Sequence, residues 1–204
     1  APVGRTEDPN PRRFEIAAEA PEEGKLLLSD GRTVARGRSF RFAGPRQEGE
    51  LAGTDKVPAR LLMPDGADVV FRRAEYDRLG GTAWLLGDGY MTTRPRASRA
   101  SSAELLARAA PAPPAAPEPN LDHVRWTDSV TISFAPDEQG PSARTIREAN
   151  FLGDVRLLRA QTGDSMRGRA LHALFAHDAN GRPYVRQTVA SGDVEARQDN
   201  TRIW

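Results

Sequence analysis

The chain has 204 residues, with 29 basic and 28 acidic side chains, a net charge of +1 at pH 7 and no cysteine. A balanced charge is unlike that of a non-specific nucleic-acid binder, and the absence of cysteine excludes disulfides, thiolate zinc sites and cysteine nucleophiles. With 38% hydrophobic residues, 18 glycines, 16 prolines and no apolar run longer than four residues, the sequence also argues against a helical bundle, a wholly disordered chain and a membrane-spanning segment.

The N-terminal part of the chain is predicted to start with a disordered lead-in, followed by strands. Residues 1–13 are polar and rich in proline, which is typical of such a lead-in. Residues 25–28 and 38–42 are predicted strands, joined through the turn residues Asp30 and Gly31. We interpret them as a divergent early unit of a single sheet.

The next part of the chain carries hairpin signals. Residues 71–76 form a strand-like run, and residues 77–81 supply an aspartate and two glycines, which suit a tight turn. The same order of a run followed by turn residues recurs over 130–141 and 171–181. This repetition predicts antiparallel hairpins.

The middle of the chain is less regular. Ser101–Glu104 has the form of a helix capping box, but an ungapped alignment with the strand-like residues 169–175 favours a strand there. Residues 109–120 contain five prolines among alanines, which indicates an extended linker or insertion. We therefore divide the chain into residues 14–108, the linker 109–120 and a second part, 121–204, that we expect to be truncated.

A Gly-Asp pair occurs three times, at Gly87–Asp88, Gly153–Asp154 and Gly192–Asp193. The segments around the first two pairs align without a gap at an offset of 66 residues, and the third pair follows the second at an offset of 39. A glycine inside a strand pattern often marks a bulge or a bend. These long intervals do not fit calcium repeats, so we expect the pairs to turn the backbone or to keep the outer face of the sheet polar.

Alternation of apolar and polar residues predicts strands with one apolar face. Phe151, Val155 and Leu157 fall on one parity, while Asp154 and Arg156 fall on the other. From the pattern alone, such a face fits a closed core better than a binding surface. The positions that we assign to the apolar face are Leu85, Met91, Val130, Ile132, Phe134, Phe151, Val155, Leu157, Leu171, Phe175 and Val194.

These motifs resemble the repeat of the periplasmic lipopolysaccharide-transport family, also called the organic-solvent-tolerance-like family. That repeat is a strand ending in Ala-x-x-Tyr-Asp, a turn, Ala-x-Leu-x-Gly-Asp/Asn-Val, and a strand with a second Ala-x-x-Leu. The resemblance spans residues 67–204 and is weaker over 14–66. The sequence departs from the family pattern at Gly89, where valine is usual, in the proline-rich insertion and in the uneven spacing of the copies. The matching segments are 74–77, 83–88, 100–106, 149–155 and 190–194.

The resemblance implies an all-β fold in which repeated antiparallel hairpins form a twisted, open β-jellyroll without catalytic activity. It implies that the apolar face lines a groove that binds the acyl chains of lipopolysaccharide or a related amphiphilic lipid, with about 0.8 kcal/mol gained per buried methylene. It also implies a periplasmic or cell-envelope location and edge-to-edge contact with other β-jellyroll modules. We expect arginines at the groove rim, among them Arg156, Arg159 or Arg197, to meet lipid phosphates.

Two other interpretations come from different functional classes. The chain could be a structural or adhesin-type β-repeat module of an envelope protein that binds protein neighbours through its sheet edges. An enzyme built on a parallel β-helix and acting on polysaccharide would need clustered acids, which the sequence lacks.

No residue pattern indicates catalysis, a metal or a cofactor. His172 and His177 are five residues apart, a spacing that suits neither a metal pair on one strand nor the i, i+4 pair of a helix. The sequence around Ser165 lacks the Gly-x-Ser-x-Gly spacing of a nucleophile elbow, and we expect a hairpin turn there. We therefore expect that the chain is not an enzyme and that it binds neither a metal nor a cofactor.

The N-terminus shows no secretory leader. The chain starts Ala-Pro-Val-Gly and reaches Arg12–Arg13 without the apolar segment of a signal peptide. We expect either a cytoplasmic protein or, as the resemblance implies, a fragment that starts after a removed leader or a preceding domain.

Overall fold

The computed structural model describes the residue ranges 15–19, 26–29, 34–44, 47–63, 67–93, 122–135, 146–159, 162–177, 183–198 and 201–203. Within these ranges the chain forms 17 strands and no helix, and the strands pair antiparallel. The predicted all-β class is therefore confirmed. The predicted lead-in 1–13, the segment 101–106 with its two interpretations and the linker 109–120 lie outside the described residues.

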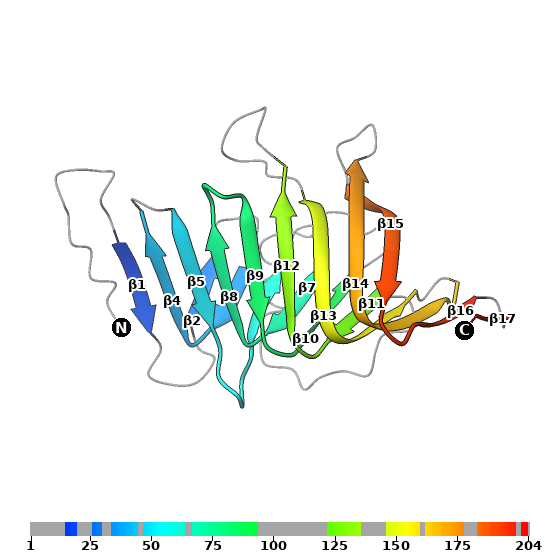
Figure 1. Ribbon diagram of the computed structural model, residues 1–204. Coiled ribbons are helices and arrows are strands. Elements are labelled where there is room, and N and C mark those ends of the chain that lie inside the picture. The colour runs from blue at the N-terminus through cyan, green and yellow to red at the C-terminus, as the bar shows by residue number, and fades with distance from the viewer. Residues whose placement is uncertain are drawn as a thin grey trace.

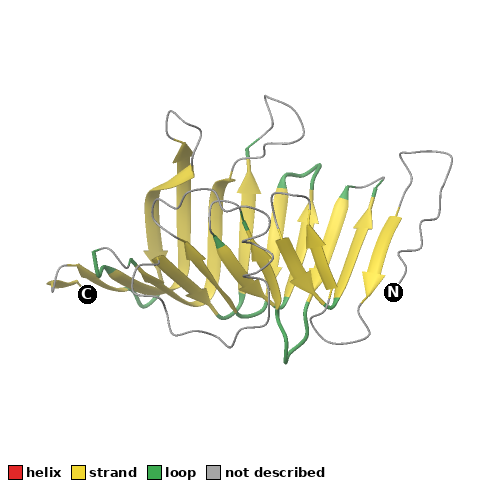
Figure 2. Cartoon of the chain, turned by 180° about the vertical axis from the view of Figure 1, so that it is seen from behind, coloured by secondary structure: helices red, strands yellow, loops and turns green. Residues whose placement is uncertain are grey.

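The sheet folds over on itself and nearly closes, so that two walls face each other (Figures 1 and 2). Wall A is the upright wall at the front of Figure 1, and wall B lies behind it. Two long strands, β13 (Ile146–Leu158) and β14 (Ser165–His177), bend and contribute to both walls.

Each wall has a continuous order of hydrogen-bonded strands. In wall A the order is β1 (Glu15–Glu19), β4 (Ser39–Ala43), β5 (Glu48–Ala52), β8 (Arg73–Asp77), β9 (Thr82–Leu86), β12 (Ser129–Phe134), then β13 and β14, and finally β15 (Pro183–Ser191). In wall B the order is β2 (Leu26–Ser29), β3 (Val34–Gly37), β6 (Ala59–Leu62), β7 (Asp68–Phe71), β10 (Gly89–Thr93), β11 (Asp122–Trp126), then β13 and β14, and finally β16 (Glu195–Gln198) and β17 (Thr201–Ile203).

The described crossings between the walls lie along one edge of the molecule, which we call the seam. Backbone hydrogen bonds join neighbouring crossings: the N–H of Gly53 donates to the carbonyl of Arg72, and the N–H of Arg169 donates to the carbonyl of Gly192, both at 2.8 Å. The seam residues are Arg38, Gly53, Arg72, Gly87, Asp88, Thr127, Asp128, Gly153, Asp154, Arg169, Gly192 and Asp193.

The three Gly-Asp pairs are corners of the seam. Each takes the chain from wall A to wall B, and Gly87, Gly153 and Gly192 have φ values of 83°, 103° and 70°. This left-handed backbone region favours glycine. At the second pair the pairing of β13 with β14 shifts by one residue, as a β-bulge does. The prediction that the pairs turn the backbone at a bulge or bend is confirmed.

The run 71–76, expected to be one strand, is divided at the seam. Phe71 is the last residue of β7 in wall B, Arg72 is the corner, and β8 starts at Arg73 in wall A. The hairpin expected after this run is present, because β8 pairs with β9 and the N–H of Gly80 donates to the Asp77 carboxylate at 2.8 Å.

The hydrophobic core lies between the two walls and is built from side chains of both. Trp126 of wall B is fully buried, its ring lies 5.8 Å from that of Phe151 in wall A, and its indole N–H donates to the Gly87 carbonyl at 3.0 Å. The buried residues of this core are Leu51, Ala59, Val69, Phe71, Leu85, Val124, Trp126, Val130, Ala149, Phe151, Val155, Leu171 and Ala173.

Candidate functional site: an apolar cleft at the β15–β16 end

The structure divides the eleven predicted face residues into three groups. Leu85, Val130, Phe151, Val155 and Leu171 are buried in the core between the walls. A second group is partly buried: Met91, Ile132, Leu157 and Phe175 pack against the core, and the ring of Phe134 meets that of Tyr76 edge to face at 6.0 Å. The third group consists of Val194 alone.

Val194 differs from the other ten positions, because it is exposed and lies outside the strands. Its side chain is 41% exposed, and it lies between the corner at Gly192–Asp193 and the first residue of β16, Glu195. Asp193 has a φ of 52°, so the backbone turns immediately before Val194. Alternation assigns faces only within a strand, and Val194 belongs to none.

A cleft of about 340 Å³ opens between β15 of wall A and the strands of wall B at this end of the sheet. Its volume falls within the range of about 300–1,000 Å³ that is common for small-molecule sites. The apolar part of its lining comes from Leu157, Met166 and Ala196, which are paired neighbours on β13, β14 and β16, together with Val185 of β15. Leu157 is therefore the one predicted face residue that lines this cleft.

Three arginines line the same cleft, namely Arg159, Arg186 and Arg197. Within the described part of the chain, none of their guanidinium groups forms an ion pair. Among the described residues of the lining, Asp164 is the only carboxylate, so guanidinium groups outnumber carboxylates there by three to one. A guanidinium offers a planar fork of donors that matches a phosphate or a carboxylate.

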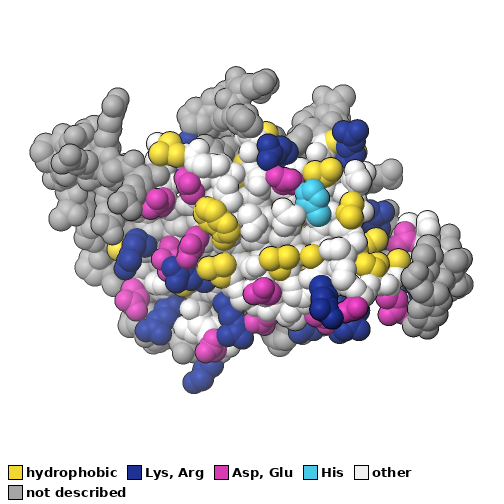
Figure 3. All heavy atoms as spheres, in the orientation of Figure 1, with side chains coloured by type: hydrophobic (Ala, Val, Ile, Leu, Met, Phe, Trp, Pro, Cys, Tyr) yellow, Lys and Arg dark blue, Asp and Glu magenta, His cyan; other side chains and the backbone are white. Residues whose placement is uncertain are grey.

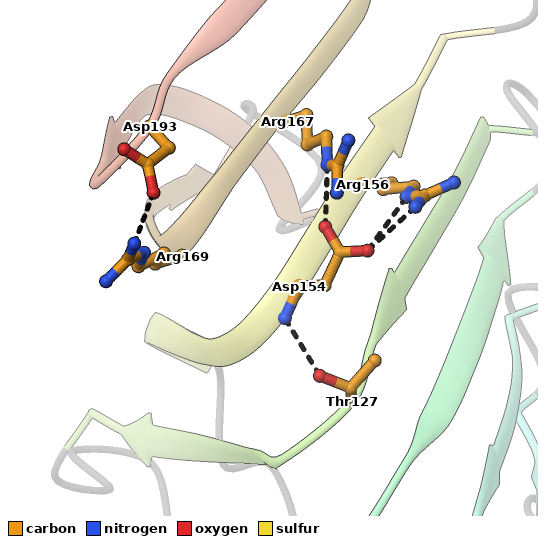
Figure 4. A network of polar contacts seen from close by, with 6 residues as sticks. All are labelled: Thr127, Asp154, Arg156, Arg167, Arg169 and Asp193. Carbon is orange, nitrogen blue, oxygen red and sulfur yellow. Dashed lines mark hydrogen bonds and ion pairs between the residues drawn. The ribbon is translucent and has the colours of Figure 1, made fainter.

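The expected rim arginines are placed differently from one another. Arg159 and Arg197 line the cleft, whereas Arg156 is not part of its lining. The Arg156 guanidinium donates instead to the Asp154 carboxylate at 2.8 Å (Figure 4). Arg186 was not anticipated, because it lies at a shift of register between β14 and β15 that the sequence pattern does not reveal.

Asp154 is the centre of a polar network at the seam (Figure 4). Its carboxylate accepts hydrogen bonds from Arg156 and from Arg167, the latter at 2.7 Å, and these bonds lower the pKa of Asp154. Beside it, Arg169 pairs with Asp193 at 2.6 Å. The Asp154 carboxylate therefore joins β13 to β14 through two guanidinium groups, and the second ion pair joins the corner at Arg169 to that at Asp193.

Contacts within the sheet explain the shifted pKa values of two other groups. Burial, and then the nearby charge of Arg125, lower the pKa of His123, whose ring stacks on Tyr90 at 5.7 Å. Hydrogen bonds of 2.8 and 2.5 Å to the carboxylate of the buried residue Asp68 raise the pKa of Arg60. These groups do not converge on the cleft.

The residues that we considered for catalysis in the sequence occupy structural positions in the sheet. Ser165 follows a turn in which the N–H of Arg159 donates to Asp164 and the N–H of Gly163 donates to Arg159, so the expected hairpin is present. The His172 ring lies 3.1 Å from the Glu148 carboxylate, and the side chain of His177 lies outside the described residues. Among the residues that the structure describes, no group of three or more His, Asp or Glu side chains could hold a metal ion.

The comparisons with known proteins give no relative. No family model, no curated protein and no solved structure matches this chain. No helix long and apolar enough to span a membrane occurs in the described parts of the chain.

Proposed function

We propose that this chain is a non-enzymatic lipid-binding module of the cell envelope. In this proposal the folded sheet is a twisted β-jellyroll, located in the periplasm, that accepts acyl chains of a lipopolysaccharide-type amphiphile where it opens at the β15–β16 end. The observation that carries the proposal is the cleft at the β15–β16 end, which combines an apolar lining with three arginines that form no ion pair with any described residue. The resemblance of the repeats to the lipopolysaccharide-transport family supports the same conclusion.

The cleft provides both contacts that an anionic amphiphile requires. Leu157, Met166 and Ala196 offer apolar surface to an acyl chain, which gains about 0.8 kcal/mol for each buried methylene. Arg159, Arg186 and Arg197 offer donors to the phosphates of the headgroup. The filled core between the walls restricts the ligand to this end of the sheet, because side chains such as Phe151 and Trp126 already occupy the centre.

Binding of purified lipopolysaccharide, with and without its phosphates, tests this proposal. Replacing Arg159, Arg186 and Arg197 together by glutamine should weaken binding of the phosphorylated lipid about tenfold or more, because charge-assisted hydrogen bonds are lost. Binding of the dephosphorylated lipid should change little. The matched control replaces three exposed arginines outside the cleft by glutamine, namely Arg38, Arg73 and Arg147.

A second candidate function is a structural module that binds protein neighbours through its sheet edges. The observation that favours it is β15, which pairs with β14 along one side and has no second partner among the described strands. Its Tyr184, Val185 and Val189 are 51%, 42% and 48% exposed. An unpaired edge with exposed apolar residues is a template for another strand. A wild-type chain that binds neither form of the lipid would favour this second function.

A further inference from the structure

The outer surface of wall A carries a region that is almost free of charge, over β9, β12, β13 and β14. Its central row runs from Trp84 through Thr131 and Asn150 to His172, which are paired neighbours on these four strands. These side chains face outward, because the residues beside them in the chain, such as Leu85 and Val130, belong to the core.

Parallel rows extend the region on both sides. The row nearer the seam is Leu86, Ser129, Leu152 and Ala170, and the row farther from it is Thr82, Ser133, Glu148 and Leu174. We call the twelve residues of the three rows the platform. Apart from the titratable His172, Glu148 is its only ionisable side chain, whereas 28% of the whole chain is charged. Figure 3 shows uncharged white and apolar yellow atoms over the centre of this face, with most of the charged side chains around it.

The central row also has polar groups without protein partners. Within the described residues, the indole N–H of Trp84, the hydroxyl of Thr131 and the amide of Asn150 form no hydrogen bond, although all three side chains are partly buried. By contrast, the indole N–H of Trp126 has the Gly87 carbonyl as its partner. Because no described protein group engages them, these donors and acceptors are available to a partner from outside.

We propose that the platform binds a neutral glycan segment. A sugar ring has an apolar C–H face that can lie on an indole ring, and its hydroxyls both donate and accept hydrogen bonds, as the side chains of Thr131 and Asn150 do. The near absence of charge on the platform matches a neutral partner better than an ionic one, which would have to lose its hydration without gaining an ion pair. At a strand spacing of about 4.8 Å, the row from Trp84 to His172 extends over about 14 Å, enough for a short oligosaccharide.

This proposal is independent of the lipid-binding function. The platform lies on the outer face of wall A, whereas the cleft opens between the walls beside β15. Either surface can therefore fail its test without affecting the other.

The test is a titration followed by NMR of the ¹⁵N-labelled indole groups. The probes are cellohexaose, chitohexaose and maltohexaose, and the signal of Trp84 is assigned by its loss in Trp84→Phe. With at least one probe, the Trp84 signal should shift and saturate, while the signal of the buried Trp126 stays in place. Trp84→Ala and the isosteric Asn150→Asp should each weaken binding at least about tenfold. Tyr184→Ala, which removes an exposed aromatic ring on β15, should leave binding unchanged.

Three outcomes would overturn the proposal. The first is no shift of the Trp84 signal with any of the three probes up to about 10 mM, which covers dissociation constants into the millimolar range. The second is equally strong binding in Asn150→Asp, a variant that keeps the side-chain shape and so keeps the fold. The third is a change in oligomeric state on Trp84→Ala, measured by sedimentation, because it would assign the platform to a second copy of the chain.

Discussion

The Thr127 hydroxyl accepts a hydrogen bond of 2.8 Å from the backbone N–H of Asp154, so that two neighbouring corners of the seam hold each other (Figure 4). Thr127 lies where the chain passes from β11 to β12, and Asp154 lies where β13 bends. Corners that are far apart in the sequence are thus joined in space, which ties the two walls together along one edge.

Replacing Thr127 by valine should destabilise the fold by about 0.5–1.5 kcal/mol, the usual net value of one hydrogen bond. The substitution keeps the size of the side chain and removes its oxygen. Thr131→Val is the matched control, because within the described residues the Thr131 hydroxyl has no partner. Urea unfolding measures both changes, and equal destabilisation by the two variants would contradict the role given to Thr127.

Gly153 should tolerate no side chain. Its φ is 103°, and a β-carbon placed there would lie 2.4 Å from the Thr127 hydroxyl and 2.8 Å from the Asp128 nitrogen. Gly153→Ala should therefore cost about 2–5 kcal/mol, combining backbone strain with overpacking. Gly163→Ala separates the two causes, since Gly163 has a φ of 72° but no atom near the added carbon, and should cost about 1–2 kcal/mol. The two alanine variants should differ clearly in thermal or urea unfolding, and similar losses would contradict the close packing at the seam.

The stability of the seam should depend on pH through Asp154. Hydrogen bonds from Arg156 and Arg167 lower the pKa of this carboxyl in the folded protein below its ordinary value of about 3.9. The stabilisation is therefore present above pH 4 to 5 and is lost as the pH falls through the lowered pKa. The free energy of unfolding of wild type should exceed that of Asp154→Asn at pH 7, and the difference should shrink below about pH 4. Asp164→Asn controls for the loss of one negative charge, and a difference that stays constant down to pH 3 would contradict the prediction.

Alanine substitutions at Phe151 and Leu157 should affect stability and lipid binding differently. Phe151 is buried against Trp126, so Phe151→Ala should cost about 3–5 kcal/mol of stability. Leu157 is only partly buried and lines the cleft, so Leu157→Ala should cost less and should weaken lipid binding. Denaturant unfolding and lipid binding, measured on both variants, test this. A Leu157→Ala chain with unchanged lipid affinity would contradict the position of the site.

The sequence was sufficient to predict the features that depend on local chemistry. Glycine in a strand pattern predicts a bend, and Gly87, Gly153 and Gly192 are all corners with positive φ. Alternation likewise placed Val130 and Phe151 on the core side, because each lies within a strand of wall A. Pattern and structure agree wherever a single strand determines the outcome.

Features that depend on where strands begin, end or shift were not predictable in this way. The run 71–76 divides at Arg72, whose carbonyl accepts a hydrogen bond from the N–H of Gly53, a residue distant in sequence. The exposure of Val194 was not predictable, because the corner at Asp193 separates it from β15 and interrupts the alternation. Arg186 enters the cleft at a register shift that appears only when β14 and β15 are paired.

The most direct test of the lipid-binding proposal compares photo-crosslinkers at two neighbouring leucines. Leu157 lines the cleft, whereas Leu158 is 41% exposed and belongs to the opposite face of the strand. The account predicts that a crosslinker at position 157 captures purified lipopolysaccharide and that one at position 158 captures little. Equal capture at both positions, or capture at neither, would contradict a lipid site in the cleft.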